Sequence, residues 1–152
     1  KPLGTAGSLR SLYGKMKSPV IVTNCDIILK MDYRDMVDFH VSNQNDITLV
    51  ASMKNYNIPY GVCEIENGGV LTRIQEKPEY NFLVNTGMYV LENNVLGFIP
   101  ENEFFHITQL IEVVKESGGK IGVYPVGDKS WIDIGEWSEY KKALSNINYI
   151  LA

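Results

Sequence analysis

The chain has 152 residues with a formal net charge of −4, and 45% of them are hydrophobic, 21% charged and 11% aromatic. These proportions are typical of one globular domain with its own core, and they exclude collagen-like, mucin-like and disordered chains. The acidic balance argues against a protein that binds nucleic acid, and no apolar run is long enough to span a bilayer.

Strand-like and helix-like segments alternate through the first half of the chain. Residues 19–23 form a short continuous apolar run, which is typical of a strand covered on both faces. A helix is predicted to begin after Asp32, whose carboxylate can cap the first turn, and His40 falls on its apolar face. Another strand is predicted at residues 46–53.

The middle of the chain predicts a β-hairpin. Residues 60–66 and 70–75 are strand-like runs, and Asn67-Gly68-Gly69 between them tolerates the positive φ angles of a tight turn. A further strand is predicted at residues 84–91.

The last third of the chain predicts two helices around one strand. The first helix ends at Gly118-Gly119, a strand follows at 120–126, and the closing helix carries Trp137 and Leu144. The first helix has four apolar residues at helical spacing: Ile107, Leu110, Ile111 and Val114. The whole order predicts a single domain over residues 1–152, with a Rossmann-like mixed α/β sheet and helices on both faces.

The number of cysteines indicates the cellular compartment of the protein. Cys25 and Cys63 are too few for a disulfide framework or a zinc site, and the first residues lack the apolar core of a signal peptide. We therefore expect a cytoplasmic protein in which both thiols are buried as small apolar groups.

Residues 2–9 form a glycine-rich stretch, PLGTAGSL, that a packing argument does not predict. Gly4 and Gly7 would let backbone amides approach a ligand closely, and Thr5 and Ser8 offer hydroxyl groups. A plain turn leading into a helix has the same pattern. The pattern is therefore consistent both with a ligand-binding loop and with such a turn.

Two aspartates stand at the ends of apolar segments. Asp26 closely follows the strand at 19–23, and Asp133 lies between Ile132 and Ile134. Open α/β sheets place ligands at the carboxyl ends of buried strands, and Mg²⁺ prefers oxygen ligands of this kind. The alternative is that Asp26 caps a turn and Asp133 caps the closing helix.

The end of the second hairpin strand carries Glu76, Lys77 and Pro78. Pro78 predicts an extended conformation for Lys77. Lys77 could then bind a phosphate, and Glu76 could accept hydrogen bonds from hydroxyl groups. The alternative is that Glu76 and Lys77 form an exposed ion pair at the end of the strand, which would contribute little to stability. Asn85 and Gly87 interrupt an otherwise apolar strand, which indicates either a bulge or a ligand contact.

Taken in order, five pieces of this sequence resemble the sugar-1-phosphate nucleotidylyltransferases. The pieces are PLGTAGSL, VTNCD, YGVCEIENGGVLTRIQEKP, NTGMYV and WIDIGEWSEY. They are most similar to the mannose-1-phosphate guanylyltransferase-like and glucose-1-phosphate thymidylyltransferase-like branch. The resemblance runs from Pro2 to about Tyr140 and implies a Rossmann-like nucleotide-binding domain with a mixed central sheet.

The resemblance also implies roles for individual residues. The nucleotide would contact Gly4, Thr5 and Ala6. Asp26 and Asp133 would bind Mg²⁺, with Asp26 beside the nucleotide as well. The catalytic groups would be Asp26, Lys77 and Asp133, with Lys77 on the sugar phosphate. The sugar 1-phosphate would be bound by five residues: Gly61, Glu76, Lys77, Asn85 and Gly87.

The implied reaction joins a nucleoside triphosphate, with GTP favoured over dTTP, to a hexose 1-phosphate. The sugar phosphate attacks the α-phosphorus and pyrophosphate leaves, which yields a nucleotide sugar for cell-surface polysaccharide synthesis. Two anions must meet, so catalysis would rest on in-line positioning and on charge neutralisation by Mg²⁺ and Lys77, with no protein nucleophile.

One family segment has no counterpart in this sequence. The family carries a glycine-rich segment of the form G-G-x-G-T-R that holds the triphosphate, and none of the 152 residues matches it. We therefore expect the chain to be the carboxyl-terminal two-thirds of a catalytic domain, truncated at its N-terminus and inactive alone. A truncated sheet would expose an edge and apolar faces, and such surfaces are consistent with a homo-oligomer.

Two other functions compete with this hypothesis. A non-catalytic regulatory homologue would keep the fold and sense a nucleotide sugar, but it would have less need of both Asp26 and Asp133. A metal-dependent glycosyltransferase of related fold is less consistent with the Glu76-Lys77-Pro78 segment and with residues 131–135.

Overall fold

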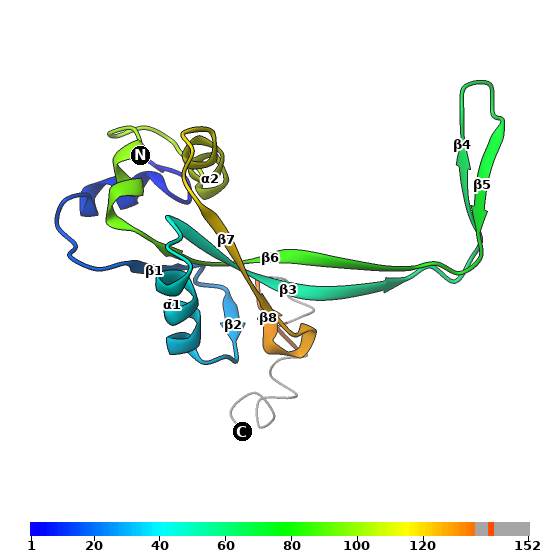
Figure 1. Cartoon of the computed structure of the whole chain (residues 1–152), viewed down its shortest axis with the longest axis horizontal. Helices are drawn as coiled ribbons and strands as arrows, with labels where there is room; N and C mark the ends of the chain where they lie inside the picture. The colour runs from blue at the N-terminus through cyan, green and yellow to red at the C-terminus, as the bar shows by residue number, and fades with distance from the viewer. Residues whose placement is uncertain (136–139, 142–152) are drawn as a thin grey trace.

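The computed structural model describes residues 1–135 and 140–141 of the chain. It contains two α-helices and eight strands among these residues; Figure 1 labels these helices and strands. Short 3₁₀ helices, designated η, lie between them. The elements in chain order are η1 Gly7–Leu12, β1 Val20–Thr23, β2 Ile27–Leu29, α1 Tyr33–Ser42, β3 Ile47–Asn57, β4 Val62–Ile65, β5 Leu71–Gln75, β6 Glu79–Leu91, η2 Asn93–Phe98, α2 Ile107–Glu116, β7 Ile121–Val126, η3 Asp128–Ser130 and β8 Trp131–Asp133.

The central sheet has four strands in the order β1-β6-β3-β7. β3 pairs antiparallel with β6 and parallel with β7, so the sheet is mixed. Ile47 and Val50 of β3 belong to different apolar clusters, because side chains at an odd offset along a strand point to opposite faces of the sheet. α2 contributes Leu110 to the first cluster and α1 contributes Met36 to the second. The predicted mixed α/β sheet with helices on both faces is confirmed.

Local signals explain the ends of both helices. The Asp32 side chain accepts a hydrogen bond from the Arg34 N–H at 2.7 Å, which caps α1 as predicted. α2 ends before Gly118, whose φ of +82° is the left-handed conformation that closes a helix. No helix of the described residues is long and apolar enough to cross a membrane.

Two predictions about single segments were wrong, and a third falls on residues that the structure does not describe. β1 is an edge strand of the described sheet, and Ile21 is 43% exposed, so it is not covered on both faces. Cys25 and Cys63 are exposed and not buried, because each lies where the chain runs over the surface. The predicted closing helix with Trp137 and Leu144 lies outside the described residues.

The β3–β6 ribbon continues beyond the sheet as a two-stranded arm, which we define as residues 53–83 (Figure 1). β7 stops pairing at Ser52, whereas β3 and β6 remain paired as far as Asn57 and Glu79. The predicted hairpin, β4–β5, forms the tip of the arm with its turn at Asn67-Gly68-Gly69.

The tip of the arm is amphipathic. Glu64 lies opposite Arg73 on one face, and their side chains form an exposed ion pair at 3.3 Å. Cys63 lies opposite Ile74 on the other face, where Ile74 is 63% exposed and Ile65 is 66% exposed. An antiparallel pair of strands with one apolar face normally packs that face against another element. Within the described residues, this apolar face is open to solvent.

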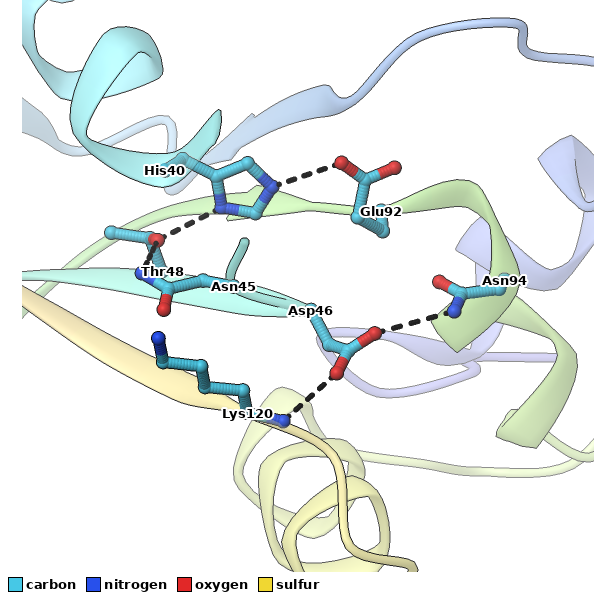
Figure 2. Close-up of polar contacts among 7 residues, drawn as sticks. All are labelled: His40, Asn45, Asp46, Thr48, Glu92, Asn94 and Lys120. Atoms are coloured by element: carbon cyan, nitrogen blue, oxygen red, sulfur yellow. Dashed lines mark hydrogen bonds and ion pairs between the residues drawn. The ribbon is translucent and has the colours of Figure 1, made fainter. Parts of the chain in front are cut away.

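A buried polar network joins α1 to the start of the sheet (Figure 2). His40 Nδ1 lies 2.8 Å from Thr48 Oγ1, and the Asn45 amide donates to the same hydroxyl oxygen at 3.0 Å. His40 and Thr48 are fully buried, and Asn45 is 3% exposed. On the other side of the ring, His40 Nε2 lies 3.3 Å from Glu92 Oε1. The network fixes α1 against β3 and against the end of β6.

The Asp46 carboxylate fixes two further segments beside this network (Figure 2). It accepts from the Lys120 backbone N–H at 2.8 Å and from the Asn94 side chain at 3.3 Å. The start of β7 and the start of η2 are therefore held at the same end of β3.

Candidate functional site

Asp26 and Asp133 are brought together by a short two-stranded sheet. β2 pairs antiparallel with β8, and Ile27 lies opposite Asp133 in that register. The Ile134 N–H donates to the Asp26 carbonyl oxygen at 2.8 Å, which extends the pairing by one residue. Residues more than 100 positions apart thus meet at one end of this sheet.

Gly135 shows how closely the two carboxylates approach. A Cβ atom added there would lie 3.0 Å from Asp26 Oδ2 and 3.2 Å from Asp133 Oδ1. The Gly135 N–H donates to Asp133 Oδ1 at 2.9 Å, which orients that carboxylate. Both aspartates are exposed, so a ligand can reach them. Asp26 Oδ2 and Asp133 Oδ1 therefore both lie beside Gly135, and a side chain at 135 would crowd both oxygen atoms.

A divalent metal ion fits this pair of carboxylates. Mg²⁺ binds oxygen ligands and commonly takes one or two carboxylates, completing its coordination with waters and substrate phosphates. Among the described residues, no third His, Cys, Asp or Glu side chain joins Asp26 and Asp133. That donor set suits a metal ion shared with a phosphorylated substrate better than a closed structural site.

The Asn85-Thr86-Gly87 segment forms a bulge in β6. Leu49 pairs with Tyr89 and Ala51 with Asn85, so three residues of β6 oppose one residue of β3. Gly87 has a φ of +86°, and its carbonyl oxygen accepts from the Asn24 N–H at 2.9 Å. The sequence indicated either a bulge or a ligand contact at Asn85 and Gly87, and the structure contains the bulge. It also places Gly87 beside the turn that carries Asp26.

Tyr89 is a residue of this region that the sequence pattern did not reveal. Its hydroxyl accepts from the Asn85 side-chain amide at 2.7 Å, and the residue is 3% exposed. Burial raises the pKa of the Tyr89 hydroxyl above its ordinary value of 10.0, and the Asn85 hydrogen bond opposes that change. In the sequence Tyr89 is one more aromatic residue of an apolar strand, so no local signal marks it.

We expect the free energy of unfolding to fall as the pH rises above about 10. Unfolded Tyr89 loses its proton there, whereas folded Tyr89 keeps its proton to a higher pH, so alkali favours the unfolded state. Urea titrations between about pH 8 and 11 should show this loss in the wild type and a smaller loss in Tyr89→Phe. Tyr60→Phe, at a residue that is 73% exposed, is the control. An equal loss in Tyr89→Phe and wild type would refute the assignment.

The glycine-rich stretch at the start of the chain packs against residues 103–107. A Cβ at Gly4 would lie 2.6 Å from the Phe105 carbonyl oxygen, and the Ala6 N–H donates to that oxygen at 2.9 Å. Thr5 Oγ1 accepts a hydrogen bond from the Ile107 N–H at 2.9 Å and so caps the first turn of α2. The glycine and the hydroxyl therefore have structural partners within the chain.

Gly61, Glu76 and Lys77 meet at the junction between the ribbon and the tip of the arm. A Cβ at Gly61 would lie 3.1 Å from Glu76 Oε2, and the Lys77 N–H donates to the Tyr60 carbonyl oxygen at 3.2 Å. Lys77 has a φ of +43°, so the predicted extended conformation was wrong. The chain bends sharply between β5 and β6 (Figure 1), and the left-handed conformation at Lys77 accommodates that bend.

The candidate residues thus form three groups in space, and the Gly4-Thr5-Ala6 loop at the start of α2 is the first of them. Asp26 and Asp133 lie together as the second group, with Gly87 against Asn24 in the turn that carries Asp26. The junction around Lys77 is separate, because β6 runs in unbroken register from Glu79 to Asn85, which spans roughly 20 Å at about 3.3 Å per residue. Figure 1 shows the arm extending away from β2 and β8.

Comparison with protein families matches residues 1–149 to the model described as nucleotidyl transferase. A mannose-1-phosphate guanyltransferase of Pichia angusta is 30% identical over 92% of this chain and 40% of its own length. A mannose-1-phosphate guanylyltransferase of Mycobacterium tuberculosis is 26% identical over 96% of this chain and 42% of its own. The chain spans about 40% of the length of these relatives.

Solved structures share the fold. HddC from Yersinia pseudotuberculosis superposes with a TM-score of 0.68 at 22% identity, over 97% of this chain and 64% of its own. The same protein complexed with GMP-PN gives a TM-score of 0.67. A putative glucose-1-phosphate thymidylyltransferase from Bacillus anthracis gives 0.66 at 20% identity, over 95% of this chain and 61% of its own.

Proposed function

The chain belongs to the nucleotidyl transferase family, and we propose that the protein containing it transfers a nucleotidyl group from GTP to a hexose 1-phosphate. The observation that carries this proposal is that Asp26 Oδ2 and Asp133 Oδ1 lie side by side against Gly135, although the two residues are far apart in the sequence. The names of the guanylyltransferase relatives and the GMP-PN complex of a structural neighbour support GTP as the nucleotide. Cytoplasmic nucleotide-sugar synthesis is the proposed setting.

In the proposed reaction, an oxygen of the sugar 1-phosphate forms a bond to the α-phosphorus of GTP. The bond between that phosphorus and the bridging oxygen breaks, and pyrophosphate leaves with the electron pair. Mg²⁺, when bound, supplies charge neutralisation of the phosphate oxygens. Asp26 and Asp133 would hold the ion, with the Gly135 N–H fixing the orientation of Asp133.

The remaining candidate residues would bind the substrates. We propose that Lys77 neutralises the sugar phosphate, that Glu76 accepts from sugar hydroxyl groups, and that the Gly61 backbone lies against the sugar. Because the Lys77 junction is roughly 20 Å along the ribbon from Asn85, the arm must bend toward β2 and β8 to serve the same substrate. At the other end, the Gly4-Thr5-Ala6 loop would contact the nucleotide through its backbone, since the Thr5 hydroxyl already covers α2.

The 152 residues alone are expected to turn over little substrate. None of them matches the family's G-G-x-G-T-R segment, so the chain would have to hold the triphosphate without that segment's arginine. We propose that they form part of one catalytic domain and that activity requires this segment as well. The open apolar face of the arm supports self-association into a homo-oligomer.

The test is pyrophosphate release, measured with four nucleoside triphosphates against several sugar 1-phosphates, including mannose 1-phosphate, with and without Mg²⁺. Two proteins are compared: the 152-residue chain, and the chain preceded by a family segment that carries G-G-x-G-T-R. We expect Mg²⁺-dependent release with GTP from the longer protein and little from the shorter one. A folded longer protein that binds nucleotide sugar but releases no pyrophosphate would favour a regulatory homologue.

A further inference from the structure

We propose that Gly87 and Asn24 are positioning residues that set the place of the Asp26 carboxylate. The metal-binding role of Asp26 rests on the proposed function, but the contact between residues 24 and 87 does not. This role differs from direct contact of Gly87 with the sugar, which is the role that the family resemblance implies.

The contact between the two residues leaves no room for a side chain at 87. A Cβ there would lie 2.5 Å from Asn24 Nδ2 and 2.8 Å from Asn24 Cγ, closer than such atoms can approach. The Asn24 N–H also donates to the Gly87 carbonyl oxygen at 2.9 Å. Asn24 therefore rests directly on the backbone of the bulge, two residues before Asp26.

The bulge itself is anchored to the central sheet. The Asn85 side-chain oxygen accepts from the Gly87 N–H at 3.1 Å, and the buried Thr86 hydroxyl donates to the Val50 carbonyl oxygen at 2.9 Å. The Asn85 amide nitrogen is held in turn by the Tyr89 hydroxyl. Since these partners belong to β3 and β6, the bulge fixes Asn24 in place and not the reverse.

Asp26 is therefore supported on two sides. Asn24 fixes the turn before it against the bulge, and the Ile134 N–H fixes its carbonyl oxygen against the end of β8. The Asp26 carboxylate meets Asp133 at Gly135, where a shift of an ångström would separate the oxygen atoms that a cation must share. A methyl group at 87 would displace Asn24 and move Asp26 away from Asp133.

The probe for this inference is Mn²⁺ alone, whose free concentration is measured by electron paramagnetic resonance. Gly87→Ala is expected to raise the Mn²⁺ dissociation constant about tenfold, the size of effect seen when support of a ligand is lost. Gly118→Ala is the matched control, because Gly118 has a φ of +82° and no atom near its Cβ position. It carries the same backbone strain without the contact, and it is expected to leave Mn²⁺ binding unchanged.

A second variant tests whether the effect passes through Asn24. Asn24→Ala removes the amide that a methyl group at 87 would meet, and alone it is expected to weaken Mn²⁺ binding several-fold. In that background, Gly87→Ala should add less than about a twofold further loss, because the two changes act on one contact. Equal losses from Gly87→Ala in both backgrounds, or unchanged Mn²⁺ binding in Asn24→Ala, would overturn the inference. The Asn24→Ala result decides the matter if Gly87→Ala does not fold.

Backbone amide chemical shifts, recorded without metal, separate this inference from the proposed function. Gly87→Ala and Asn24→Ala should shift the Asp26 and Ile134 amide signals, whereas Gly118→Ala should not. If the wild type binds no Mn²⁺ but these signals shift, the metal pair of the proposed function fails and the positioning role stands. Unshifted signals in both variants would refute the positioning role.

Discussion

The Asp26→Asn variant is expected to release pyrophosphate at least about 100-fold more slowly than the parent protein with GTP, sugar 1-phosphate and Mg²⁺. The substitution keeps the shape of the side chain but removes one of the two negative charges that converge at Gly135. Asparagine is a poor ligand for a hard divalent cation that must neutralise phosphate oxygens in the transition state. The measurement is initial velocity in the longer protein, over a range of Mg²⁺ concentrations.

Two comparisons make this result specific. Asp133→Asn should lose about as much activity, and the double variant should lose little more than either single variant, since both residues would hold one ion. Asp128→Asn is the control: Asp128 lies in η3, next to β8, and forms an ion pair with Lys54. A fully active Asp26→Asn variant would contradict the metal role, as would additive losses in the double variant.

Replacing Thr48 by valine is expected to lower the free energy of unfolding by about 3 kcal/mol. Valine has nearly the same shape, so the packing is retained while the hydroxyl is lost. Without it, His40 Nδ1 and the Asn45 amide each lose a partner inside a fully buried site. An unsatisfied buried polar group costs about 1–3 kcal/mol, and here two groups are affected.

Urea titration followed by circular dichroism measures this loss. Thr23→Val is the control, because Thr23 is an exposed residue of the edge strand β1 and the substitution is the same. That variant should remain within about 0.5 kcal/mol of the wild type. If Thr48→Val is as stable as Thr23→Val, the network shown in Figure 2 contributes nothing to stability.

The parts of the fold that were predicted correctly carry strong local signals. Asp32 marks the start of α1, the apolar spacing of α2 ends at Gly118, and Asn67-Gly68-Gly69 marks the turn of the hairpin. β2 and β8 were missed for the opposite reason. Each has three residues, too few to show a periodic pattern, and each is paired with a strand more than 100 residues away.

In the candidate site, too, features that depend on tertiary contacts were not predicted from local sequence signals. Asp26 and Asp133 were first connected as two carboxylates at the ends of apolar segments, and the family resemblance then assigned both to one metal ion. No spacing rule joins residues so far apart, and the β2–β8 register supplies the physical reason. The conformation of Lys77 was predicted wrongly because the rule for residues before proline is local, whereas the turn between β5 and β6 is tertiary. The contact of Gly87 with Asn24 likewise depends on a bulge that the sequence marks only as an irregular strand.

β3 connects two regions of different cooperativity along one continuous strand. Residues 47–52 lie between β6 and β7 and pair with both, except for Val50 opposite the bulge, whereas residues 53–57 pair with β6 alone. Amide protons should therefore exchange with solvent slowly up to Ser52 and much faster beyond it, with no loop between the two regimes. We expect the outer ribbon to open and reclose without unfolding of the core. Lys77 can thus sample new positions without disturbing Asp26 and Asp133.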